Sequence, residues 1–139
     1  MRSCFFILLL VSLLRGFAQE IHPIDLKLKA CLDSSENQTT TGMANCCYRA
    51  EDSWDKEMNK YYNLLMKSKS IPKEEKEKLK EAQIKWLAYR DSEILYSNTH
   101  YNNYQGTMWI SVAAQRTAEI VKDRTLALKI YYDELPFSK

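Results

Sequence analysis

The chain has 139 residues, with 20 Lys and Arg against 18 Asp and Glu, and therefore a formal net charge of +2. Its length is typical of a single domain. With 3 Gly and 3 Pro it has too few turn-forming residues for a loop-rich all-β fold. It also has no basic cluster that would hold a nucleic-acid backbone, so no nucleic-acid partner is expected.

Residues 1–18 have the layout of a secretory signal peptide. Arg2 gives a positive start, residues 4–14 are almost entirely apolar, and Gly16 and Ala18 are small residues at the −3 and −1 positions of a cleavage site. A retained membrane anchor is the weaker alternative, because the apolar run is far shorter than the ~20 residues that span a bilayer. We expect export, a periplasmic or secreted location, and no membrane span after cleavage.

The expected mature chain, residues 19–139, forms a single helical domain in this interpretation. It is electrically neutral, because cleavage removes two of the 20 basic residues and none of the 18 acids. It therefore has no acidic surplus that would attract a cationic protein. It keeps Cys31, Cys46 and Cys47, an odd number for a compartment in which disulfides persist.

Apolar periodicity predicts helices along this chain. A short helix is expected over 24–32, after Pro23, and a polar loop over 34–41. The first long helix begins near Met43, and its predicted buried stripe is spaced by three and four residues: Met43, Cys47, Ala50, Trp54, Met58, Tyr61 and Leu65.

A second long helix is expected to begin at Pro72, since proline is tolerated in a first turn. The acids that follow it suit the positive end of the helix dipole. Its predicted buried stripe is Leu79, Ala82, Trp86, Tyr89 and Tyr96, and residues 97–106 are expected to form a loop. The last helix has the stripe Ile110, Ala114, Thr117, Val121, Thr125, Leu128 and Leu135, and Pro136 ends it.

The predicted fold is therefore all-α: a small antiparallel bundle of three long helices plus a short N-terminal helix. Trp54, Trp86 and Trp109 are expected to anchor its core rather than to line a ligand site.

The search for catalytic chemistry is negative. His22 and His100 are isolated from other metal-ligating residues, and Cys46 and Cys47 are adjacent rather than spaced as in a redox or zinc motif. No Gly-rich phosphate loop or nucleophile elbow is present. We expect no catalytic residue, no metal and no cofactor, and hence a protein that is not an enzyme.

Several motifs together identify a family. They are Trp54-Asp55-x-Glu57-Met58-Asn59, Trp86-x-x-Tyr89-Arg90-Asp91 and Arg124-Thr125-x-x-Leu128, with Cys31 and Gly42-Met43-x-x-Cys46 upstream. Over residues 31–135 the chain resembles the secreted LprI-type lysozyme inhibitors, the DUF1311 family.

The resemblance implies an all-α bundle with one disulfide, Cys31–Cys46, which closes a loop of about 15 residues and contributes roughly 3 kcal/mol. Cys47 is expected to be a buried free thiol, with an intermolecular bridge as the alternative. Family members usually carry two further cysteines, but here Ile94 occupies the first of these positions and no Cys follows Cys47.

Polar residues of the motifs are expected to tie helices together: Asp55, Asn59, Arg90, Asp91 and Arg124. Neighbouring residues on a helix diverge by about 100°, so Arg90 and Asp91 are not expected to pair with each other. Instead Arg90 is expected to reach Asp55, and Asp91 to reach Arg124. A ligand site at these residues is the alternative.

The family implies inhibition of a lysozyme through protein–protein binding. The candidate binding loop contains Asn98, His100, Tyr101, Asn103 and Tyr104, because Tyr and Asn combine contact area with adaptable hydrogen bonding. An ordinary inter-helix loop is the alternative for this segment. A periplasmic binding or adaptor module with a non-lysozyme protein partner is the alternative function.

Overall fold

The structure is a computed structural model that describes residues 21–136. It contains α2 (Pro23–Asp33), the single-turn helix η2 (Ser35–Asn37), α3 (Thr40–Lys67), α4 (Lys73–Asn102) and α5 (Met108–Asp133). No strand occurs over these residues, so the all-α prediction of three long helices after a short one is confirmed. The expected signal peptide, residues 1–18, lies outside the described residues.

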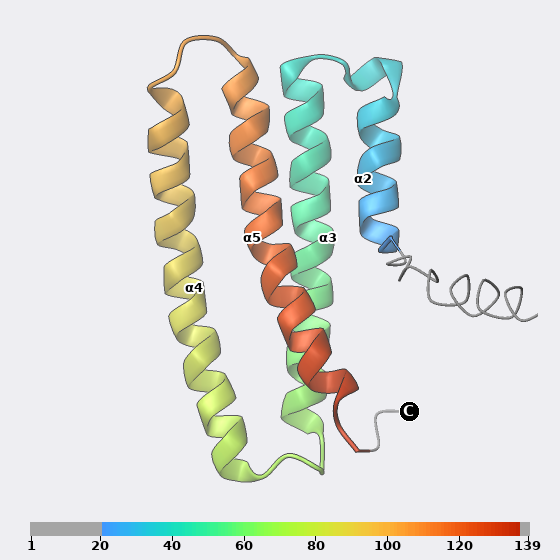
Figure 1. Ribbon diagram of the computed structural model, residues 1–139, viewed down its shortest axis with the longest axis vertical. Coiled ribbons are helices and arrows are strands. Elements are labelled where there is room, and N and C mark those ends of the chain that lie inside the picture. Colours follow the sequence, from blue (N-terminus) through green and yellow to red (C-terminus); the bar gives the residue numbers. More distant parts are fainter. Residues whose placement is uncertain (1–20, 137–139) are drawn as a thin grey trace, which may run out of the picture.

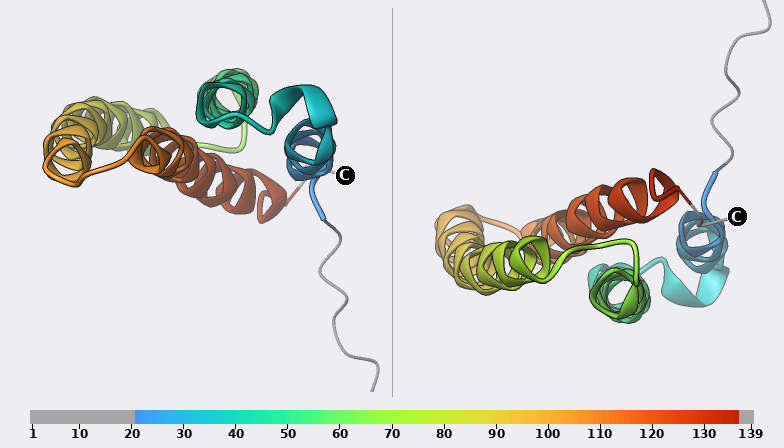
Figure 2. Two further views of the ribbon diagram at one scale, coloured as in Figure 1. Left: turned by 90° about the horizontal axis from the view of Figure 1, so that it is seen from above. Right: turned by 90° about the horizontal axis from the view of Figure 1, so that it is seen from below.

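The three long helices run antiparallel to their chain neighbours, and α5 lies between α3 and α4 (Figure 1). The end views show the same order, with α4 at one edge and α2 at the other (Figure 2). The most extensive packing joins α3 to α5, whereas α4 packs mainly on α5 and α2 on α3. The helix α4 is thus an edge helix with one principal neighbour. Between residues 21 and 136 no helix is long and apolar enough to cross a membrane.

The predicted stripe of α3 is confirmed. Every member after Met43 is buried, and Trp54, Met58 and Leu65 are each 1% exposed. The stripe faces α5, where Ala114, Val121 and Leu128 are equally buried. On both helices the apolar residues are spaced by three and four positions, which places them on one side of each helix and in one continuous interface.

The predicted stripe of α4 is wrong for Ala82, Tyr89 and Tyr96, which are exposed. The residues of α4 that are buried are Gln83 and Ser97. Because α4 has only α5 as a principal neighbour, a narrow strip of its surface is covered. This strip contains Gln83 and Ser97, together with the half-buried Leu79 and Trp86, which pack against the core as predicted.

The short helix α2 is tied to α3 by the disulfide Cys31–Cys46, with the two Cα atoms 5.8 Å apart. This confirms the predicted pairing, and Cys47 is a free, buried thiol as expected. The link between these helices is compact: a Cβ atom on Gly42 would lie 2.8 Å from the backbone of Asn37. Glycine is needed at position 42 because the two backbones approach so closely.

Candidate functional site

The connection between α4 and α5 is shorter than predicted. The expected loop over residues 97–106 is wrong, because α4 continues to Asn102 and contains Asn98, His100 and Tyr101. Only Asn103 and Tyr104 of the candidate binding residues lie in the turn.

The reason lies in the backbone. Neither Gly nor Pro occurs in this segment before Gly106, whose φ of +98° suits the left-handed region that the turn requires. The hydroxyl of Thr99 donates a hydrogen bond to the carbonyl of Leu95 at 2.8 Å, so this polar side chain is satisfied within the helix. Asn and Tyr in the segment therefore indicate exposure rather than the end of the helix.

Five rings gather where α4 turns into α5, and we call them the aromatic tip: Tyr96, His100, Tyr101, Tyr104 and Trp109. The His100 ring lies 5.8 Å from Tyr96, and 5.1 Å from both Tyr101 and Tyr104. The Trp109 ring stacks on Tyr101 at 5.7 Å and lies 4.8 Å from Tyr104. Such offset and edge contacts between aromatic rings are favourable.

Helical spacing explains the cluster. Tyr96 and His100 are four residues apart in α4, which places their rings on one side of the helix. Tyr104 follows in the turn, where its ring still packs against His100. The turn then brings Trp109 against them. Trp109 was expected in the core and is instead part of the tip, while Trp54 is buried as predicted and Trp86 is half-buried.

Hydrogen bonds hold the tip in place. Nε1 of Trp109 donates to the carbonyl of Gln105 at 3.1 Å, and the Tyr104 hydroxyl lies 3.3 Å from Nε2 of His100. The hydroxyls of Thr107 and Thr40 are 3.2 Å apart and connect the tip to the start of α3. The rings are thus fixed before any partner binds.

The tip presents an uncharged surface. Residues 94–115 contain no Asp, Glu, Lys or Arg. Tyr104 is 46% exposed and the neighbouring Met108 is 58% exposed. This combination of exposed apolar area with hydroxyl, amide and imidazole groups is typical of a protein-binding surface.

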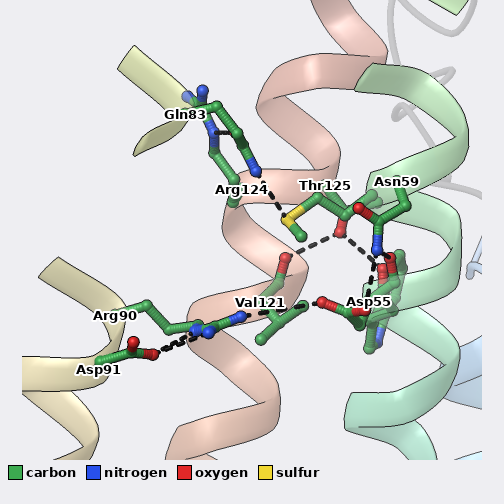
Figure 3. A network of polar contacts seen from close by, with 10 residues as sticks. Asp55, Asn59, Gln83, Arg90, Asp91, Val121, Arg124 and Thr125 are labelled. Atoms are coloured by element: carbon green, nitrogen blue, oxygen red, sulfur yellow. Dashed lines mark hydrogen bonds and ion pairs between the residues drawn. The ribbon is translucent and has the colours of Figure 1, made fainter. Parts of the chain in front are cut away.

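The motif residues form a second cluster, at the junction of α3, α4 and α5 (Figure 3). Arg90 of α4 lies 3.9 Å from Asp55 of α3 and 2.7 Å from Asp91. The expectation that Arg90 and Asp91 do not pair is therefore wrong. The long arginine side chain bends along the helix surface and spans the angle between the two positions.

Two further expectations for this cluster are wrong. Asp91 does not reach Arg124, because Nε of Arg124 donates to Oε1 of Gln83 at 2.9 Å. Asn59 does not tie α3 to another helix, since its amide donates to the backbone and side-chain oxygens of Asp55 one turn earlier, both at 2.9 Å. Asn59 instead orients the carboxylate that faces Arg90.

Two residues that were not among the predicted polar ties complete the junction. Gln83 approaches Sδ of Met58 at 3.6 Å. The Thr125 hydroxyl lies 3.1 Å from the Trp54 carbonyl of α3 and 2.8 Å from the Val121 carbonyl of its own helix. Both residues are buried and polar, which makes the junction a structural tie between helices.

Electrostatics supports this structural role. The guanidinium groups of Arg90 and Arg124 lie 5.6 and 6.0 Å from the Trp86 ring, within reach of a cation–π interaction. Burial lowers the pKa of Arg124. Burial, and next the charge of Asp52, raises the pKa of Glu51, against the opposing effect of Arg90.

Among the described residues no group of His, Cys, Asp and Glu side chains is placed to hold a metal ion.

The part of the chain that matches known proteins includes both clusters. The family model described as "Lysozyme inhibitor LprI" matches residues 31–128. The crystal structure of an uncharacterized protein from Burkholderia thailandensis is similar, with a TM-score of 0.75 and 30% sequence identity over 83% of this chain. The match spans 56% of that longer chain. No curated protein matches the sequence significantly.

Proposed function

The chain belongs to the LprI lysozyme inhibitor family, and from this premise we propose that it binds a lysozyme through the aromatic tip and blocks its substrate cleft. The family is one of inhibitors, so the chain acts by binding rather than by catalysis. The observation that carries the proposal is the tip itself: five packed rings at the end of a helical hairpin, in an uncharged stretch of sequence.

The chemistry of a lysozyme cleft suits this tip. Glycoside hydrolases use a pair of carboxylic side chains that flank the scissile bond. A tip without Asp or Glu brings no like charge against them. The imidazole of His100 and the hydroxyls of Tyr101 and Tyr104 supply hydrogen-bond donors, and the ring faces cover the apolar area on which sugars pack.

Rigidity favours binding as well. Tyr and Trp offer a large contact area with only two side-chain torsions each. Here the rings already pack on one another, and Thr107 meets Thr40 of α3. Little conformational entropy is therefore lost when the tip enters a cleft.

Export is part of the proposal. The disulfide Cys31–Cys46 supports an oxidising location such as the periplasm or the exterior of the cell, which is where a lysozyme would be met. The expected signal peptide, residues 1–18, gives the route. Fractionation of producing cells, with detection of the cleaved chain outside the cytoplasm, tests this point.

The test of function is a lysozyme turbidity assay with the purified mature chain. We expect slower clearing of a peptidoglycan suspension by a lysozyme of the hen-egg or goose type. No inhibition of either type at about a tenfold molar excess, by protein with an intact helical spectrum, would contradict the proposal and favour an adaptor module with another protein partner.

A further inference from the structure

Charge is unevenly distributed along α4. Residues 73–85 contain nine charged side chains, whereas residues 86–102 contain three, Arg90, Asp91 and Glu93. All three form ion pairs within the chain: Arg90 with Asp91 and Asp55, and Glu93 with Arg116 at 3.7 Å. The outward surface of the second half of α4 is therefore left without an unpaired charge.

This outward surface is apolar and exposed. A row of residues spaced by four, Ile84, Ala88, Ser92 and Tyr96, is exposed along its whole length. Ile84 is 58% and Tyr96 64% exposed, and the flanking residues Tyr89 and Leu95 are 52% and 69% exposed. We call these six residues the outer face of α4. The helix α5 covers the opposite side of α4, where Gln83 and Ser97 are buried.

We propose that the outer face of α4 pairs with the same face of a second copy of this chain, in an antiparallel, two-fold symmetric dimer. The row has the pattern that a two-fold axis requires. With the axis midway between positions 88 and 92, Ala88 faces Ser92 of the second copy, and Ile84 faces its Tyr96. Each contact then occurs twice, as in an isologous interface.

The side-chain sizes fit this pairing. Ala88 and Ser92 are small and lie where the two helices cross, so the backbones approach closely, while larger side chains fill the space on either side. Rows of residues four apart are the ridges that interlock in the commonest class of helix packing. The charged first half of each α4 faces the second half of the other, where the three charged residues Arg90, Asp91 and Glu93 are already paired within their own chain.

The available area also fits. The four large side chains of the outer face expose roughly 500 Å², taking about 200 Å² for a whole large side chain. Specific interfaces begin at about 1,200 Å² in total, or about 600 Å² per partner. Ala88, Ser92 and the neighbouring Thr99 supply the remainder, so the dimer lies at the small end of specific interfaces and its population depends on concentration.

A second copy fits this face better than a lysozyme does. The face is uncharged, straight and self-complementary, and it lies on the side of a helix rather than on a protrusion. Tyr96 belongs to both the outer face and the aromatic tip, so the dimer covers this ring. The pairing places the other four rings of each tip at opposite ends of the dimer, outside the row that pairs. The inference is therefore independent of the proposed function.

Sedimentation velocity of the mature chain over a hundredfold range of concentration tests the dimer. We expect the sedimentation coefficient to rise with concentration to the value of a dimer. Ala88→Arg places two bulky charges at the crossing point and should weaken dimerisation at least tenfold. Ser92→Arg is a second variant with the same expected effect. Leu26→Arg, at a residue of α2 that is 51% exposed, is the matched control and should dimerise normally.

Disulfide trapping tests the orientation. When Ala88→Cys and Ser92→Cys chains are mixed and oxidised, we expect the mixed disulfide to form faster than either homodimeric one. A wild-type chain that stays monomeric at every concentration, a dimer unaffected by both arginine variants, or preferred 88–88 cross-links would each overturn the proposal.

Discussion

Nε of Arg124 donates a hydrogen bond to Oε1 of Gln83 at 2.9 Å, across the interface between α5 and α4. Gln83 is 7% exposed, and burial lowers the pKa of Arg124. The edge helix is thus held by a polar pair, the buried Gln83 and the half-buried Arg124, at the position where a bundle usually has an apolar contact.

This pair predicts an asymmetric response to mutation. Gln83→Leu leaves a buried guanidinium without its acceptor and should reduce the free energy of unfolding by about 1–3 kcal/mol. The double variant Gln83→Leu/Arg124→Leu should recover most of that loss, because neither partner is then left unsatisfied. Urea unfolding measures both. Gln115→Leu, at an exposed glutamine of α5, is the control, and a double variant no more stable than Gln83→Leu would contradict the interpretation.

The disulfide makes a second prediction. Replacing both Cys31 and Cys46 with Ala should lower the free energy of unfolding by about 3 kcal/mol, because the open chain gains conformational freedom when unfolded. Urea unfolding of the variant, and of the wild type with a reductant, should give similar midpoints. If the reduced wild type were as stable as the oxidised one, the bridge would not stabilise the fold.

Cys47 is expected to be chemically inert in the folded chain. Burial, and next the charge of Glu119, raises the pKa of its thiol, and the thiolate is the reactive form. Without reductant, we expect no thiol to react with a thiol reagent in the native mature chain and one to react in urea. With reductant and urea all three mature-chain cysteines should react. Rapid labelling of the native chain would show that the thiol is accessible.

Tip substitutions test the proposed binding surface. Tyr101→Ala combined with Tyr104→Ala should weaken lysozyme inhibition at least about tenfold, the loss that corresponds to 1.4 kcal/mol of binding free energy. The melting temperature should change little, because the tip lies outside the core between α3 and α5. Tyr131→Ala, at a 54% exposed tyrosine at the far end of α5, is the matched control. Equal loss of inhibition in this control would place the contact elsewhere.

Glu51 makes the stability depend on pH. Because burial and Asp52 raise its pKa in the folded state, the native chain holds this proton more tightly than the unfolded chain. Protonated Glu51 therefore contributes to the free energy of unfolding. This contribution is fully present below the ordinary carboxyl pKa and is lost as the pH rises through the folded-state pKa of Glu51. Glu51→Gln should stabilise the protein at neutral pH and have no such effect near pH 3, below the ordinary value of about 4.3.

Urea unfolding at the two pH values measures the Glu51 effect. Glu81→Gln is the control, because hydrogen bonding and the charge of Lys85 lower the pKa of Glu81. Its substitution should change stability in the opposite direction at neutral pH. A neutral-pH loss of stability in Glu51→Gln would show that the attraction of the Arg90 charge outweighs burial.

Much of the site was visible in the sequence, though not its form. Asn98, His100, Tyr101, Asn103 and Tyr104 were selected by composition, and the structure places them at one end of the bundle. Asn98, His100 and Tyr101 are helical rather than part of a loop, whereas Asn103 and Tyr104 lie in the turn. The four-residue spacing of Tyr96 and His100 is the signal in the sequence for a helix that carries these two rings.

Periodicity in the sequence predicts a helical chain, the buried stripe of α3 and the stripe of α5 from Ala114 to Leu128, although Ile110, the first member of the α5 stripe, is 49% exposed. The family motifs imply that Cys31 pairs with Cys46. The helices and their buried stripes depend on the spacing of apolar residues along the chain, which the sequence contains directly. Which side of α4 is covered could not be predicted in this way. That depends on how many neighbours a helix has, and α4 has one, so Gln83 and Ser97 are buried while Tyr89 and Tyr96 face outward.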